Sequence, residues 1–209
     1  MSQFIEMFGN PLSLNQKNEL KRLGECCILN PRRPNIALCD TDKVSFIPMP
    51  AVSEDGYWVD MTDEEYGKVK KGFTYFENND VLFAKITPCM QNGKSAIARN
   101  LTNGVGCGST EYYVIRPKTD DLIIDYVYLV LRHHAVLKAA QNSFGGSAGQ
   151  QRVSSQYVKS IVIPHPPIDV QKSIIATVIQ KKERAKQLQS EGSKVLEEAK
   201  ATIEKMILG

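Results

Sequence analysis

Long apolar runs are missing from this sequence of 209 residues. No stretch approaches the ~20 consecutive apolar residues that a membrane-spanning helix needs. The opening segment Met1–Phe8 has neither the basic start nor the apolar stretch of an export signal. We therefore expect a cytoplasmic protein that does not enter a membrane.

A cysteine framework is missing as well. The odd set of five cysteines shows no C-x-x-C spacing, and the three histidines complete no ligand set with them. These residues are Cys26, Cys27, Cys39, Cys89, Cys107, His133, His134 and His165. We expect reduced, partly buried thiols, no metal site and no cofactor.

A strong charge of one sign is also missing. Twenty-six Lys and Arg stand against 23 Asp and Glu, which gives a net charge of +3 and a pI near 8.5. This is below the pI of ~9 that would by itself indicate a nucleic-acid-binding domain. Residues 80–110 and 145–160 are nevertheless locally basic. The bulk composition, 42% hydrophobic and 23% charged, is that of an ordinary folded protein.

Complete catalytic motifs are missing too. Gly93-Lys-Ser95 resembles the end of a phosphate-binding loop, but Pro88 stands where that loop requires its first glycine. His165-Pro-Pro-Ile168 departs at both ends from the Asp/Asn-Pro-Pro-aromatic motif of amino methyltransferases. Glu198-Ala-Lys200 resembles half of a nuclease metal site, but it lies on the predicted long helix with no identifiable convergent carboxylate, so a solvated charge pair is the better interpretation. The sequence therefore predicts a protein without catalytic residues.

Short apolar runs separated by turn residues fill the chain from Glu19 to Pro117, which predicts a twisted, mostly antiparallel sheet or partial barrel. The expected strands are Val44–Pro50, Tyr57–Met61, Gly72–Phe76, Val81–Thr87, Ser95–Ala98 and Tyr112–Arg116. The apolar spacing from Asp120 to Gln141 predicts one helix, capped by Asp120 or Asp121 and followed by Gly145-Gly146. A last strand is expected over Val158–Ile163.

Three polar turns carry side chains of the types that can read DNA. Amides match the adenine edge, Lys and Arg suit guanine or phosphate, and hydroxyls bind either bases or phosphates. The turns are Lys85–Lys94, a glycine-rich turn over Gly104–Glu111, and Gly145–Arg152. Ordinary surface hairpins and a glycine-rich linker with a salt-bridging arginine remain the alternatives. The candidate DNA-binding residues are Lys85, Thr87, Gln91, Asn92, Lys94, Ser109, Thr110, Gln150, Gln151 and Arg152, with Arg32 and Arg33 as looser phosphate contacts.

A long helix is predicted from Asp169 to about Leu208. Alternating spacings of four and three residues define a coiled-coil seam, which is apolar at seven of ten positions. The apolar positions are Ile174, Val178, Ala185, Leu188, Val195, Ala199 and Met206, with Lys181, Gly192 and Thr202 between them. At ~1.5 Å per residue such a rod would reach ~60 Å. We expect it to pack on another helix.

Several of these segments together closely resemble a target recognition domain of the specificity subunit of type I restriction-modification systems. They are Phe46–Pro50, Gly72–Phe76, Asp80–Lys94, Gly108–Glu111 and Val114–Pro117. Gln151–Ser154, Ile161–Pro164 and Pro166–Gln171, leading into the long helix, look like the conserved spacer region of that family.

The resemblance implies an α+β fold with a DNA target recognition domain over 19–166 and a conserved helix over 167–209. That helix would serve dimerisation and methyltransferase docking. Residues 1–18 resemble the end of a spacer helix, since Ile5–Gly9 echoes Ile203–Gly209. The implied partners are double-stranded DNA, methyltransferase and restriction subunits, and a second copy of this chain. A coiled-coil interaction adaptor, or the recognition part of a fused methyltransferase-nuclease, are the competing hypotheses.

Overall fold

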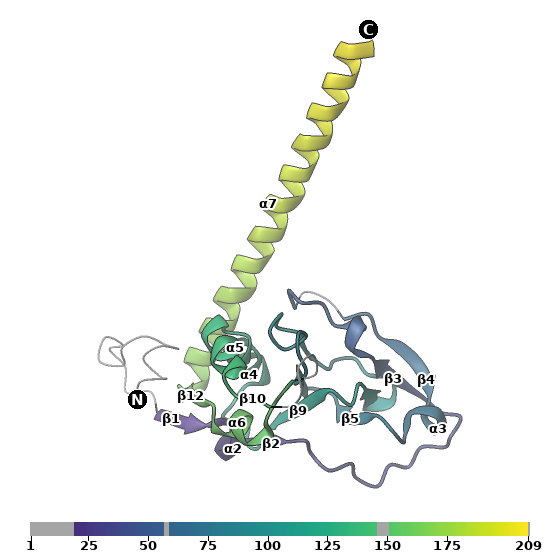
Figure 1. Cartoon of the computed structure of the whole chain (residues 1–209), viewed down its shortest axis with the longest axis vertical. Helices are drawn as coiled ribbons and strands as arrows, with labels where there is room; N and C mark the ends of the chain where they lie inside the picture. The colour runs from purple at the N-terminus through teal and green to yellow at the C-terminus, as the bar shows by residue number, and fades with distance from the viewer. Residues whose placement is uncertain (1–18, 57–58, 146–150, 209) are drawn as a thin grey trace. The chain divides into compact units, whose positions relative to one another are not determined.

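The computed structural model describes residues 19–56, 59–145 and 151–208 (Figure 1). The chain divides into two compact units, and the boundary lies between Ile168 and Asp169. The predicted N-terminal segment 1–18 falls outside the described residues. The first unit contains the strands and short helices, and the second consists of one long helix.

The first four-stranded sheet positions two of the predicted turns. Its strands are β2 (Cys27–Leu29), β9 (Tyr112–Pro117), β6 (Val81–Ala84) and β7 (Ser95–Ile97), antiparallel and in that order. Every residue of β6 is buried, as expected for a central strand. Ala84 pairs with Tyr112, so the end of β6 lies beside the start of β9. The turn that follows β6 and the turn that precedes β9 therefore share one edge of the sheet.

The second sheet consists of β4 (Thr62–Glu65), β3 (Lys43–Ile47), β8 (Val105–Gly108) and β5 (Thr74–Glu77), in that order. The β3–β8 pair is parallel and the other two pairs are antiparallel. In Figure 1 its labelled strands β3, β4 and β5 lie on the right-hand side of the first unit. The α+β class and the mostly antiparallel pairing are confirmed.

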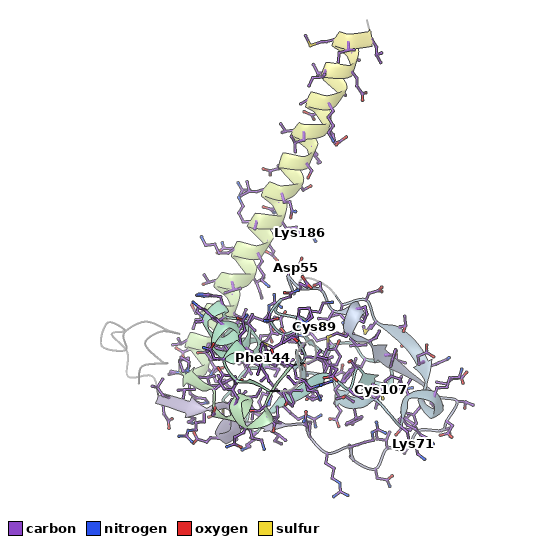
Figure 2. The ribbon with its side chains drawn as sticks, viewed as in Figure 1. Asp55, Lys71, Cys89, Cys107, Phe144 and Lys186 are labelled. Atoms are coloured by element: carbon purple, nitrogen blue, oxygen red, sulfur yellow. The ribbon has the colours of Figure 1, made fainter. Side chains whose placement is uncertain are left out.

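A buried strand replaces most of the predicted glycine-rich turn from Gly104. All four residues of β8 are buried, including Cys107, which Figure 2 labels. A Cβ atom on Gly106 would lie 2.0 Å from Cε2 of Phe76, and one on Gly108 would lie 2.3 Å from the carbonyl oxygen of Ile47. These glycines permit close packing at the centre of the sheet instead of forming a turn.

One hydrophobic core joins the two sheets. It includes Ile47 and Phe76 from the second sheet together with Leu82, Tyr112 and Val114 from the first. A second cluster lies around Val44, Val105 and Cys107 of the second sheet, where the short helix α3 (Tyr66–Val69) contributes Tyr66 and Val69. Both faces of the second sheet thus contribute to a core.

Two helices occupy the region where one was predicted. These are α4 (Ile124–Leu131) and α5 (His134–Gln141). His133 interrupts them and caps α5, because its Nδ1 atom accepts a hydrogen bond from the amide of Ala135 at 3.3 Å. The N-cap of α4 is Ile123, so the prediction of Asp120 or Asp121 was wrong.

Half of the segment predicted as a final strand, residues 158–160, is helical, and only residues 162–163 lie in a strand. Helix α6 (Ser155–Ser160) begins after Ser154, whose side chain accepts from the amide of Tyr157. The strand β12 (Val162–His165) follows and pairs with β1 (Glu19–Arg22). The smaller elements are α2 (Leu23–Cys26), η1 (Met49–Ala51), η2 (Thr102–Gly104), β10 (Phe144–Gly145) and β11 (Arg152–Val153). Of the predicted strand Tyr57–Met61, Val59 forms an isolated bridge with Val52, and residues 57–58 lie outside the described part.

The long C-terminal helix is confirmed as α7 (Ile168–Leu208). Figure 2 shows side chains, Lys186 among them, projecting from both sides of this helix along its length. Large apolar side chains are exposed along it, namely Ile174, Ile179, Leu188, Val195, Leu196, Ile203, Met206, Ile207 and Leu208. Leu196 and Ile203 adjoin the predicted seam and widen its apolar stripe. Within the described residues, none of the helices has the length and apolar character needed to cross a membrane.

Gly106→Ala tests the close packing of β8. We expect it to lower the free energy of unfolding by roughly 1–3 kcal/mol, because the new methyl group would overlap the ring of fully buried Phe76. Gly145→Ala is the matched control, since no heavy atom lies within 4 Å of the position that its new methyl group would take. Chemical denaturation measures both. Equal stability of the two variants would contradict the packing role.

Candidate nucleic-acid interface

Backbone hydrogen bonds bring three polar segments together. The amide of Lys85 donates to the carbonyl of Glu111 at 2.9 Å, and the amide of Thr87 donates to the carbonyl of Gln151 at 3.0 Å. The amide of Val153 then donates to the carbonyl of Lys85 at 2.9 Å. Segments from residues 85–94, 109–111 and 151–153 therefore lie side by side, although they are far apart in the sequence.

The turn between β6 and β7 is folded on itself. The amide of Met90 donates to Ile86, that of Asn92 to Pro88 and that of Lys94 to Cys89, at 2.9, 3.0 and 2.9 Å. The Met90 side chain is fully buried and anchors the turn. Gly93 has φ +75°, a left-handed conformation that suits glycine. These contacts shape the turn and leave Gln91 and Asn92 exposed at its surface.

Arg132 lies at the break between α4 and α5, and its hydrogen bonds hold this turn in place. Its Nη1 atom donates to the carbonyl of Gly93, and its Nη2 atom donates to the carbonyl of Glu54 at 2.8 Å. The guanidinium also lies over the ring of Tyr128, 5.6 Å from its centroid. Asn92 also contacts Glu54, since its Nδ2 atom donates to Oε1 of Glu54 at 2.8 Å. The amide of Asn92 thus has a partner within the protein.

The two candidate lysines are half-buried and differ in their surroundings. Lys85 Nζ lies 5.5 Å from the ring centroid of Tyr113, which favours a cation–π contact. Lys94 Nζ lies 3.4 Å from the carbonyl oxygen of Met49. Thr87 is also half-buried. Both lysines belong to the turn between β6 and β7.

The turn before β9 presents two hydroxyls and one carboxylate. Ser109 Oγ accepts from the amide of Glu111 at 3.1 Å, so this hydroxyl stabilises the turn. Thr110 is exposed. Glu111 follows these two residues in the chain, and it was not among the candidate DNA-binding residues predicted from the sequence.

Glu111 forms a two-pronged ion pair with Arg152. Nε of Arg152 donates to Oε2 at 2.9 Å, and Nη2 donates to Oε1 at 2.7 Å. The hydrogen bond from Arg152 lowers the pKa of Glu111 below its ordinary value, and the charge of Lys85 contributes to the same shift. Arg152 is therefore salt-bridged, the alternative that the sequence left open, while its predicted DNA contact remains a prediction.

The arginines Arg32 and Arg33 lie outside this cluster of contacts. Arg33 donates to the carbonyl of Lys70, and its guanidinium lies 5.1 Å from the ring centroid of Tyr75. These contacts give Arg33 a structural role. Arg32 is exposed. Gln150 lies outside the described residues, whereas the half-buried Gln151 is placed by its backbone carbonyl.

Sequence reasoning missed Glu111, Arg132 and Tyr113 at this site. A single carboxylate among basic turns was a usable signal for Glu111, since an acid there requires a cationic partner. No local pattern indicated Arg132, because it acts from a helix break about 40 residues along the chain. Across the described part of the chain, no three His, Cys, Asp or Glu side chains gather closely enough to hold a metal ion.

The fold and the site together define a class of protein. Its members have a mixed α/β recognition domain on which polar segments converge, followed in the chain by a long helix. The family described as "Type I restriction modification DNA specificity domain" matches residues 15–198. This chain belongs to that family, and the resemblance noted from the sequence is confirmed.

Two curated proteins from Escherichia coli are similar in sequence to this chain. The type I restriction enzyme EcoEI specificity subunit is 37% identical over 170 residues, which are 80% of this chain and 28% of that protein. The EcoAI specificity subunit is 36% identical over 170 residues, which are 80% of this chain and 29% of that protein. The chain thus spans less than a third of the length of these relatives.

Solved structures confirm the fold. The HsdS subunit from Thermoanaerobacter tengcongensis superposes with a TM-score of 0.64 at 20% identity, covering 81% of this chain and 43% of that one. A chain from a structure on complex assembly and conformational transition of the type I R-M system gives a TM-score of 0.56 at 15% identity, covering 90% of this chain and 46% of that one.

Arg132→Lys tests how the β6–β7 turn is held. Lysine keeps the charge but lacks the planar fork that reaches two carbonyl groups. We expect faster hydrogen exchange at the amides of Gly93 and Lys94, with unchanged exchange in β9. Arg99→Lys is the control, because Arg99 bonds Asp125 at the far end of β7 from the turn. Unchanged exchange at Gly93 would show that Arg132 does not hold the turn.

Proposed function

We propose that this chain is the DNA-reading part of a type I specificity subunit. It would read one half of a two-part site and direct methyltransferase and restriction subunits to that site. The observation that carries the proposal is the convergence of residues 85–94, 109–111 and 151–153 in a chain of the DNA specificity domain family. No catalytic residue is required for this role.

The converged side chains suit both parts of DNA recognition. Phosphate contacts place a protein on the duplex and base contacts provide specificity. Lys85 and Lys94 supply cationic groups, while exposed Gln91 and Thr110 supply an amide and a hydroxyl. Among the candidates, Arg32 is exposed and suits a looser phosphate contact. The contacts of Arg33 within the protein make it a weaker candidate.

Helix α7 supports self-association. Its exposed apolar residues need a covering partner, and a helix of a second copy offers a self-complementary one. Two copies related by a twofold axis would present two recognition domains, which would read inverted half-sites. The same helix pair would offer a docking surface for methyltransferase subunits.

The two competing functions make different predictions. A coiled-coil adaptor accounts for α7 but gives no reason for three polar turns to converge. A recognition part fused to a methyltransferase-nuclease would share this interface. The curated relatives are both named specificity subunits, which supports a separate subunit.

Selection from a randomised duplex library, using the chain together with the methyltransferase subunit of its own system, tests the proposed function. We expect a defined half-site. Lys94→Ala should weaken binding to all sequences and flatten the slope of log affinity against log salt by about one unit, as for the loss of one phosphate contact. Lys68→Ala is the control, since Lys68 is an exposed residue of α3 that already pairs with Glu65. Selection of no motif by the wild-type complex would overturn the proposal.

Leu188→Glu tests the twofold association. A charge placed in an apolar seam is costly to bury, so we expect the dimer to dissociate at micromolar concentration. Ser190→Glu is the matched control, because it adds the same charge outside the seam. Residue 190 lies about 200° around the helix from residue 188. Sedimentation equilibrium measures both variants. Identical behaviour of the two variants would exclude the seam from the interface.

A further inference from the structure

The ion pair between Glu111 and Arg152 is unusual among the candidate DNA contacts, because it places a negative charge at the proposed interface. The DNA backbone repels a carboxylate, so an acid in this position needs a reason. The two-pronged contact provides one, because the carboxylate accepts hydrogen bonds from both Nε and Nη2 and so fixes the guanidinium in one orientation.

Charge balance argues against a phosphate contact for Arg152. Affinity for the backbone depends on the number of phosphates that cationic side chains neutralise. Glu111 cancels the charge of Arg152, so the pair as a whole contributes almost nothing to this term. Lys94 carries a charge that no described carboxylate pairs at salt-bridge distance, and it suits phosphate better.

Reading a base does not require net charge. Arginine recognises guanine by donating to its N7 and O6 atoms in a fixed geometry, so the position of the guanidinium decides the contact. A side chain held in place before binding loses less conformational freedom when it meets the base. A carboxylate that fixes the guanidinium therefore suits base reading better than phosphate binding.

The backbone holds both members of the pair. The Glu111 amide donates to Ser109 Oγ, and its carbonyl accepts from the Lys85 amide. On the other side, Arg152 forms an antiparallel bridge with Ile86. The side chain of Glu111 is 24% exposed and that of Arg152 is 41% exposed, so the pair is accessible from solvent. The pair thus joins all three converging segments at an accessible position.

We propose that Glu111 and Arg152 form one base-reading unit, in which Glu111 positions the guanidinium of Arg152 to read a guanine in the half-site. This inference rests on the proposed function. Glu111 is a positioning residue, and Arg152 makes the base contact. The pair adds hydrogen-bonding specificity, while the lysines provide attraction to the backbone.

Selection from the randomised library and salt titration of the full chain with its methyltransferase subunit test this unit. Arg152→Lys keeps the charge and loses the fork. We expect the preference for guanine at one position to fall roughly 5- to 150-fold, with the other positions and the salt slope unchanged. Arg99→Lys, which alters an arginine paired with Asp125, should leave every position unchanged.

Glu111→Gln separates positioning from simple structural support. It keeps one oxygen acceptor and removes the negative charge. We expect a weaker preference at the same guanine, together with tighter binding to unrelated sequences and a salt slope steeper by about one unit. A purely structural role would weaken all sequences alike and would not steepen the slope.

The outcomes distinguish this inference from the proposed function. A wild-type motif that Arg152→Lys leaves unchanged would overturn the inference alone. An Arg152→Ala variant that binds all sequences more weakly by the same factor, with the preference for guanine unchanged, would assign Arg152 to phosphate and would also overturn it. A wild-type complex that selects no motif would overturn both.

Discussion

The antiparallel register of β6 and β9 is the constraint on which the rest of the site depends. Ala84 pairs with Tyr112 at one end of this ladder, and the polar turns leave from there. At the other end, Asp80 is fully buried and its carboxylate oxygens accept from Nε and Nη2 of Arg116, both at 2.7 Å. The ion pair lies one residue beyond the Val81–Ile115 pair, so it is satisfied in this register. A slip of one residue would turn every side chain of β6 to the other face.

The third segment depends on the first two. Residues 151–153 return to Lys85 and Thr87 through backbone hydrogen bonds, and the hydroxyl of Tyr113 donates to the carbonyl of Val153 at 2.8 Å. Strand β9 thus supports the site in two ways, since Glu111 immediately precedes its first residue. Rigid strands with short polar turns are well suited to recognition, because they place side chains without ordering a loop on binding.

The predictable parts of the fold were those with a strong local pattern. The apolar runs predicted as strands over Val81–Thr87 and Tyr112–Arg116 contain the two central strands β6 and β9, and the spacing after Asp169 identified α7. The prediction was wrong at β8, because a strand with two glycines has the composition of a turn until Phe76 packs against it. It was also wrong at α6, where Ser154 caps a helix that the apolar pattern concealed.

The sequence by itself determined the class of the protein and the chemistry available to it: amides, hydroxyls and cationic groups in polar turns, with a long amphipathic helix after them. These properties depend on residue type and local spacing, which are both visible in one dimension. Tertiary structure alone decided that three turns meet, that Arg33 packs on Tyr75 and that Arg152 pairs with Glu111. Such pairings join residues 40 or more positions apart, and their register is fixed by sheet pairing and core packing.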